Sequence, residues 1–190
     1  MLWLILGLLL FLGIHSVSIV APAWRDAQAA RMGERAWKGV YSVVSIVAFV
    51  VLVVGYGMAR QSAPVLYTPP AWTRHVALLV MLPVFPLIVS AYFPGRIQAA
   101  LRHPFLLGVM LWAFAHMLAN GTLADLLLFG SFLAWAVVDR LSVARRPARP
   151  LPGAPRRPVN DVIAIVVGLL VYTLFVVRGH LWLIGVSPIG

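Results

Sequence analysis

LWLILGLLLFLGIHSVSIVA, residues 2–21, opens the chain and contains no Asp, Glu, Lys or Arg. A helix of about 20 mostly apolar residues is long enough to cross the hydrocarbon core of a bilayer. No basic residues precede this stretch and Pro22 follows it directly, so we expect a retained transmembrane helix rather than a cleaved signal peptide. The opening stretch therefore predicts a membrane protein.

Five further apolar stretches follow, and together they predict an all-α, polytopic membrane helical bundle of about six transmembrane helices in a single domain, residues 1–190. Pro83 and Pro86 fall inside the third stretch and should kink it, because proline removes backbone donors. A Pro- and Arg-rich loop is expected from Asp139 to Pro158. The expected spans are residues 2–21, 37–58, 72–91, 104–119, 123–138 and 159–177.

The overall composition supports this interpretation. Hydrophobic residues make up 62% of the chain and charged residues only 11%, whereas a soluble domain carries about 25% charged residues. A net charge of +10 could indicate a nucleic-acid-binding protein, but the basic residues lie in short gaps between the apolar stretches. We therefore expect membrane lipid, and no nucleic acid, as a partner. The absence of cysteine excludes disulfides, thiolate nucleophiles and Cys-bound metal.

The positions of the basic residues predict the orientation in the membrane. Cytoplasmic loops of membrane proteins are enriched in Lys and Arg. Of the fifteen basic residues, Arg60, Arg74 and Arg178 fall in the gaps on one side of the membrane. The others fall on the opposite side, which places both termini in the periplasm if the protein is bacterial. They are Arg25, Arg31, Arg35, Lys38, Arg96, Arg102, Arg140, Arg145, Arg146, Arg149, Arg156 and Arg157. The Arg-rich loop either binds anionic lipid head groups or only fixes this topology.

Histidines are the side chains best suited to carry chemistry. His15 and His116 lie inside expected spans, where an ionisable group is costly and is a functional candidate. The alternative is a neutral histidine that is hydrogen-bonded to a neighbouring helix. His103 and His116 share the fourth span, but thirteen residues correspond to about 20 Å of rise and to opposed faces, so they cannot bind one metal together. His15 and His116 lie on different helices and could do so.

The surroundings of these histidines leave several roles open. Gly108 shares a helix face with His116 and leaves room either for a macrocycle or for a closely packed helix. His103 follows Arg102 at the expected cytoplasmic end, where it is either a polar group for a cofactor or substrate head group or an interfacial anchor. His75 and His180 are expected outside the spans, where they could edge a periplasmic site.

The acidic residues include fewer candidates for a functional role within the membrane. Asp125 follows the Asn120-Gly121 turn and is expected to cap the fifth span. Asp125 and Asp161 are the acids that approach a span, and both do so from its end. An ion-coupled transporter that relies on carboxylates within the membrane is therefore disfavoured.

Several motifs, taken in order, carry a family resemblance. GIHS (residues 13–16) ends the first span, RHPFLLG (102–108) opens the fourth and AHMLANG (115–121) closes it. HLWLIGV (180–186) lies near the end of the chain. Together these stretches resemble the NnrU family of bacterial inner-membrane proteins over nearly the whole chain.

The resemblance implies an inner-membrane protein linked to denitrification, the respiratory reduction of nitrite and nitric oxide, with respiratory membrane proteins as possible partners. The family is similar to zeta-carotene isomerase, a membrane haem b protein. Carried over from that isomerase, the haem ligands are His15 and His116, with Arg102 and His103 as further cofactor-binding residues. Haem b is therefore the expected cofactor, in a redox, sensing or assembly component.

Two enzymatic alternatives remain. The protein could be a haem-dependent cis–trans isomerase of a carotenoid-like polyene. The RHPxxxG pattern of residues 102–108 also resembles membrane methyltransferases that use S-adenosylmethionine. Against the methyltransferase, the loop from Asp139 to Pro158 stands where such enzymes carry further acidic and aromatic motifs.

Overall fold

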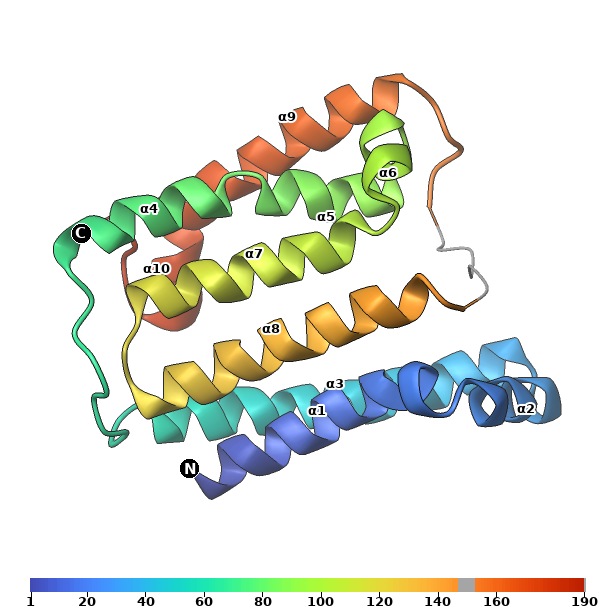
Figure 1. Ribbon diagram of the computed structural model, residues 1–190, viewed down its shortest axis with the longest axis horizontal. Helices are drawn as coiled ribbons and strands as arrows, with labels where there is room; N and C mark the ends of the chain where they lie inside the picture. The colour runs from blue at the N-terminus through green and yellow to red at the C-terminus, as the bar shows by residue number, and fades with distance from the viewer. Residues whose placement is uncertain (147–152, 190) are drawn as a thin grey trace. The chain divides into compact units, whose positions relative to one another are not determined.

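The computed structural model describes residues 1–146 and 153–189, and helices dominate this part of the chain (Figure 1). The helices form two compact units, Met1–Thr68 with Gly121–Arg146 and Pro69–Asn120 with Pro147–Gly190. The all-α membrane fold expected from the sequence is confirmed. The single domain over residues 1–190 stays a prediction. Arg149, one of the basic residues of the expected loop, lies outside the described residues.

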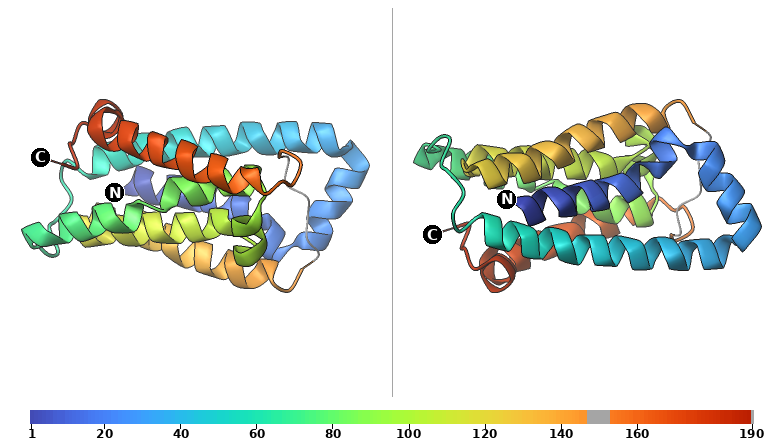
Figure 2. Two further views of the ribbon diagram at one scale, coloured as in Figure 1. Left: turned by 90° about the horizontal axis from the view of Figure 1, so that it is seen from above. Right: turned by 90° about the horizontal axis from the view of Figure 1, so that it is seen from below.

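The first unit contains α1 (Leu2–Val20), α2 (Pro22–Met32), α3 (Glu34–Ala59) and α8 (Leu123–Val143). α1 packs against both α3 and α8, and the short α2 joins α1 to α3 (Figure 2). Glycines allow α1 and α3 to approach closely. A Cβ atom on Gly55 would lie 2.5 Å from the carbonyl carbon of Trp3, and one on Gly7 would overlap the backbone of Leu52. Small residues at helix contacts are typical of membrane proteins, where close packing replaces the hydrophobic effect.

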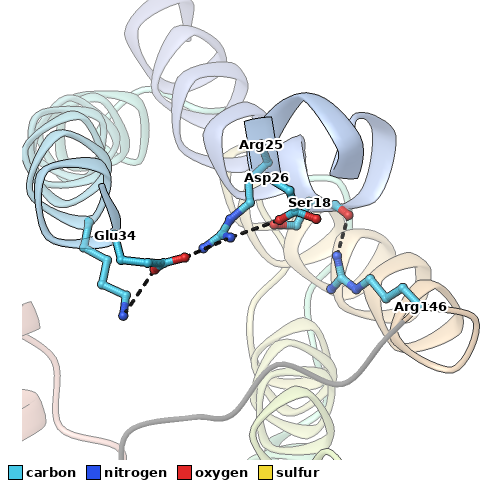
Figure 3. Close-up of polar contacts among 6 residues, drawn as sticks. Ser18, Arg25, Asp26, Glu34 and Arg146 are labelled. Carbon is cyan, nitrogen blue, oxygen red and sulfur yellow. Dashed lines mark hydrogen bonds and ion pairs between the residues drawn. The ribbon is translucent and has the colours of Figure 1, made fainter. Parts of the chain in front are cut away.

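Charged residues hold the α2 end of this unit together (Figure 3). The guanidinium of Arg25 donates to Asp26 at 3.0 Å and lies 3.6 Å from Glu34. Lys38 lies 3.5 Å from the same Glu34 carboxylate, one helical turn away on α3. These partly exposed pairs contribute little energy individually, and the Arg25–Glu34 pair joins α2 to the start of α3.

The end of α8 differs from the expectation. The fifth span was expected to end at Val138 and a loop to begin at Asp139, but α8 continues to Val143. Asp139 is buried inside the helix and pairs with Arg146 at 2.6 Å. Arg146 also donates to the carbonyl of Ser18 at the end of α1 (2.5 Å; Figure 3). Hydropathy counts the Asp139 charge against a membrane helix, but the ion pair with Arg146 compensates that charge, and the helix continues past it.

The start of α8 confirms the expected capping role of Asp125. Thr122 is the N-cap residue, and the Asp125 carboxylate accepts a hydrogen bond from the Thr122 backbone N–H at 3.1 Å, which completes a capping box. The Tyr56 hydroxyl on α3 also donates to Asp125 at 2.6 Å. Asp125 therefore satisfies helix donors and links α8 to α3.

The second unit contains α4 (Ala71–Met81), α5 (Val84–Tyr92), α6 (Arg96–Leu101) and α7 (Pro104–Ala119). It also contains α9 (Val159–Leu174), a π-helical turn η1 (Phe175–Gly179) and α10 (His180–Ile184). α5 packs against α7 and α9, and α4 packs against α7. The expected kink is confirmed, because Pro83 separates α4 from α5.

The last apolar stretch is longer than expected. The sixth span was expected to end at residue 177, but the helix continues through η1 and α10 to Ile184. Gly179 does not end the helix, because its φ and ψ angles of −61° and −40° are helical. Within this last stretch, the first residue with a positive φ angle is Gly185 (+78°), and the helix ends there.

Five stretches of the described helices are long and apolar enough to cross a membrane: Leu2–Val20, Glu34–Ala59, Ala71–Tyr92, Leu123–Val143 and Val159–Ile184. The fourth expected span, α7, has the expected bounds but only 16 residues. Six crossings and periplasmic termini therefore stay predictions. Val43, Ile46 and Val50 share one face of α3 and are each more than half exposed. Such an apolar surface suits contact with lipid.

The close contact of α1 with α3 leads to a paired test. Gly55→Ala places a methyl group against the Trp3 backbone, whereas Gly57→Ala, two residues on, meets no atom within 4 Å. We expect Gly55→Ala to be less stable than Gly57→Ala by about 1–3 kcal/mol, the usual range for overpacking. Reversible unfolding in mixed detergent and SDS micelles measures the difference. Equal stabilities would contradict the packing described for this helix pair.

Candidate functional site

His15 lies on α1 in the first unit, surrounded by aromatic rings from three helices. Its ring centroid lies 4.3 Å from that of Phe11, 5.6 Å from that of Tyr41 on α3 and 6.1 Å from that of Trp135 on α8. The Trp135 ring meets it edge-on, with an interplanar angle of 90°. His15 is half-buried. Its ring therefore faces the aromatic interior of the unit.

One hydrogen bond determines which nitrogen of His15 is basic. The Nδ1 atom lies 2.6 Å from the carbonyl oxygen of Phe11, four residues earlier in the helix. A carbonyl oxygen only accepts, so Nδ1 carries the hydrogen and Nε2 carries the lone pair. Metal-binding histidines usually donate their second ring nitrogen to a carbonyl or carboxylate in this way, which fixes the ring and increases its basicity. His15 is thus arranged to bind a metal through the lone pair of Nε2.

His116 repeats this arrangement on α7 in the second unit. Its Nδ1 atom lies 2.8 Å from the carbonyl oxygen of Trp112, again four residues earlier. The indole of Trp112 lies beside the imidazole, with ring centroids 5.3 Å apart. The Asn120 amide donates to the His116 carbonyl at 2.8 Å at the end of the helix. His116 therefore presents Nε2 as its basic nitrogen, as His15 does.

The role of Gly108 is settled by its neighbours. A Cβ atom at Gly108 would lie 3.4 Å from both the Ile88 side chain and the Val84 carbonyl oxygen, which belong to α5. Of the two roles that the sequence left open, the structure shows close helix packing. The small residue on the His116 face of α7 therefore accommodates a neighbouring helix.

Arg102 has a strained backbone. Its φ and ψ angles are +61° and −46°, and the His103 N–H donates to the Leu101 carbonyl at 2.7 Å. This is a γ-turn with positive φ, a rare and strained conformation for a residue with a side chain. The turn reverses the chain between α6 and α7, leaves the Arg102 side chain exposed and makes His103 the N-cap residue of α7.

Two residues at the start of α9 hold the beginning of α6, the short helix that leads into this turn. The Asp161 carboxylate accepts hydrogen bonds from the backbone N–H groups of Arg96 (2.9 Å) and Ile97 (3.0 Å), so it caps α6 from another helix. The buried Asn160 amide donates to the carbonyls of Pro94 (2.9 Å) and Pro155 (3.0 Å). Strained backbone persists where surrounding contacts over-determine it. The sequence showed Asp161 only as an acid near a span end and gave no signal for Asn160.

The structure separates some predicted site residues and brings others together. His103 and His116 lie at opposite ends of α7, as the sequence predicted. His15 belongs to the first unit and His116 to the second, so their pairing stays a prediction. His180 was not predicted beside His116, yet their ring centroids lie 6.4 Å apart within the second unit. The described residues contain no cluster of three or more His, Cys, Asp or Glu side chains suited to a metal.

Long apolar helices, close glycine contacts and half-buried histidines define a polytopic α-helical membrane protein. More particularly, the chain belongs to the NnrU family, since the model of that family, described as NnrU protein, matches residues 3–188. Neither a curated protein nor a solved structure matches the chain. The family match covers both units, including all five histidines.

The strain at Arg102 leads to a comparison of two substitutions that both remove its side chain. Glycine adopts positive φ freely, whereas alanine does not. We expect Arg102→Gly to be more stable than Arg102→Ala by about 1–2 kcal/mol, the usual difference for such a conformation. Thermal unfolding in detergent measures it. If Arg102→Ala proved as stable as Arg102→Gly, the backbone of this turn would not be strained.

Proposed function

We propose that this protein binds haem b in the bacterial inner membrane, with His15 and His116 as the iron ligands, and that it serves as a redox or sensing component linked to denitrification. Membership of the NnrU family supports the inner-membrane and denitrification parts of the proposal. The cofactor is proposed from the motif resemblance and from the chemistry of the two histidines.

A single observation carries the cofactor proposal. Both histidines bond Nδ1 to the carbonyl oxygen four residues earlier, at 2.6 Å for His15 and 2.8 Å for His116. Each Nε2 lone pair is therefore suited to bind iron, because imidazole nitrogen is a regular axial ligand of haem. The donor set fits the group. The proposal requires a histidine of the first unit and one of the second to bind the same iron.

The chain's own residues would control the properties of such a centre. Haem held by two imidazoles supplies a one-electron redox couple. The Nδ1 hydrogen bonds hold the rings in place and make Nε2 a stronger donor. The rings of Phe11, Tyr41 and Trp135 lie beside His15 and make its surroundings largely aromatic. The hydrophobic surroundings of a metal site are one of the means by which proteins adjust a redox potential.

Arg102 and His103 have a separate place in the proposal. His103 precedes the proposed ligand His116 by thirteen residues, about 20 Å along the helix axis, so neither Arg102 nor His103 is proposed to bind the iron. The exposed Arg102 guanidinium is suited to an anionic head group of a cofactor or substrate. The γ-turn fixes the position from which its side chain projects.

Absorption spectroscopy of the purified protein tests the proposed cofactor. After expression with ample haem, we expect a Soret band and the spectrum of a six-coordinate, low-spin haem. His15→Ala and His116→Ala should each lose haem or become five-coordinate and high-spin, whereas His75→Ala should retain the original spectrum. Equal thermal stability of the variants controls for misfolding. A wild-type protein without a Soret band would end the haem proposal.

Growth under denitrifying conditions tests the proposed role. In a denitrifying bacterium that lacks the gene, we expect the wild-type chain and His75→Ala to restore anaerobic growth on nitrite, and His15→Ala and His116→Ala to fail. Immunoblots of membranes confirm equal amounts of each variant. Full restoration by both histidine variants would show that the protein acts without the proposed centre, as a non-catalytic assembly factor would.

A further inference from the structure

His116 and His180 form a pair of imidazoles inside the second unit. Their ring centroids lie 6.4 Å apart and their ring planes are inclined by only 21°. The two residues come from α7 and α10, and α8, α9 and η1 lie between them in the sequence. We propose that His116 and His180 are the two protein donors of a site for one transition-metal ion.

The π-helical turn is what places His180 in this position. The His180 backbone N–H bonds to the Phe175 carbonyl, five residues earlier. In a continuous α-helix, Gly179 would occupy the place above Phe175 instead. The extra residue in the turn sets the His180 imidazole edge-on against the Phe175 ring, with centroids 5.7 Å apart. Such single π-turns are rare and frequently occur at functional sites.

A second local feature fixes the orientation of the His180 ring. Gly185, with φ +78°, ends α10 and turns the chain back, so that the Val186 carbonyl oxygen lies 2.7 Å from His180 Nδ1. Nδ1 therefore carries the hydrogen and Nε2 carries the lone pair. His116 has the same assignment through the Trp112 carbonyl. Both rings of the pair thus have Nε2 as the metal-binding nitrogen, and both rest against an aromatic side chain.

The separation of the rings agrees with the dimensions of a metal site. A metal–imidazole bond is about 2 Å long and the ring centroid lies roughly 1 Å beyond the nitrogen, so imidazoles on opposite sides of one ion have centroids about 6 Å apart. Direct stacking of two neutral rings covers the same range of separations. The number of imidazole nitrogens bound to an added ion distinguishes these two arrangements.

The donor chemistry indicates the class of ion. Imidazole nitrogen suits copper, zinc, nickel and iron, while calcium and magnesium require oxygen ligands. Two protein donors leave the remaining coordination positions to water or to a small ligand. Among divalent ions, Cu²⁺ binds nitrogen sites most tightly, which makes it the most sensitive probe.

This site rests on the proposed function only in sharing His116. One Nε2 lone pair binds one metal, so iron bound through His116 and an ion held by His116 and His180 exclude each other. The histidine pair is therefore tested on haem-free protein, and the two proposals succeed or fail separately.

Cu²⁺ titration of haem-free, tag-free protein in detergent, followed by electron paramagnetic resonance, tests the pair. We expect one Cu²⁺ per chain with two imidazole nitrogens bound. His116→Ala and His180→Gln should each weaken binding at least tenfold and leave no more than one nitrogen. His75→Ala removes another histidine of the same unit and should bind Cu²⁺ as the wild type does.

Two results would overturn the metal site. One is a His180→Gln variant that binds Cu²⁺ with unchanged affinity and nitrogen count. The other is a wild-type spectrum with a single bound nitrogen, which needs no variant and so does not depend on the folding of one. In protein preloaded with haem, loss of Cu²⁺ binding supports a shared His116. A Soret band without a Cu²⁺ site would refute only the histidine pair, and a Cu²⁺ site without a Soret band would refute only the haem.

Discussion

The functional account depends on one interaction, the hydrogen bond from a histidine Nδ1 to a backbone carbonyl. His15 and His116 use the carbonyl four residues earlier in their own helices, and His180 uses the Val186 carbonyl after a turn. In a membrane, polar groups must find partners within the protein, and the helix itself offers this acceptor. In the neutral ring, the bond fixes the tautomer with the hydrogen on Nδ1. It thereby turns three side chains that are costly to bury into nitrogen donors of defined orientation.

The rest of each unit holds these donors in place. In the first unit, the glycine contacts of α1 with α3 bring the His15 helix close to Tyr41, and α8 adds Trp135. In the second unit, Gly108 brings α7 close to α5, and η1 rotates His180 towards the end of α7. Helix packing through small residues and one irregular turn therefore determine where the imidazoles lie.

Hydropathy and helix-ending residues were sufficient to predict most of the helices. The bounds of α7 were predicted correctly because Pro104 begins it and the Asn120-Gly121 turn follows its end. The end of α8 was predicted wrongly, because the pairing of Asp139 with Arg146 compensates a charge that hydropathy counts against a helix. The γ-turn at Arg102 could not be predicted, because a positive φ angle at a residue with a side chain has no signature in the sequence pattern. The position of His180 beside His116 was not predicted, because the π-helical turn that places it there has no signature in hydrophobic periodicity.

The tautomers of the helix histidines test the central claim most directly. Nitrogen-15 solid-state NMR of histidine-labelled, haem-free protein in lipid distinguishes a protonated from an unprotonated ring nitrogen, and single His→Gln variants assign the signals. For His15 and His116 the account predicts a protonated Nδ1 and an unprotonated Nε2. A protonated Nε2 on either residue would contradict it, because that nitrogen would then have no lone pair to bind a metal.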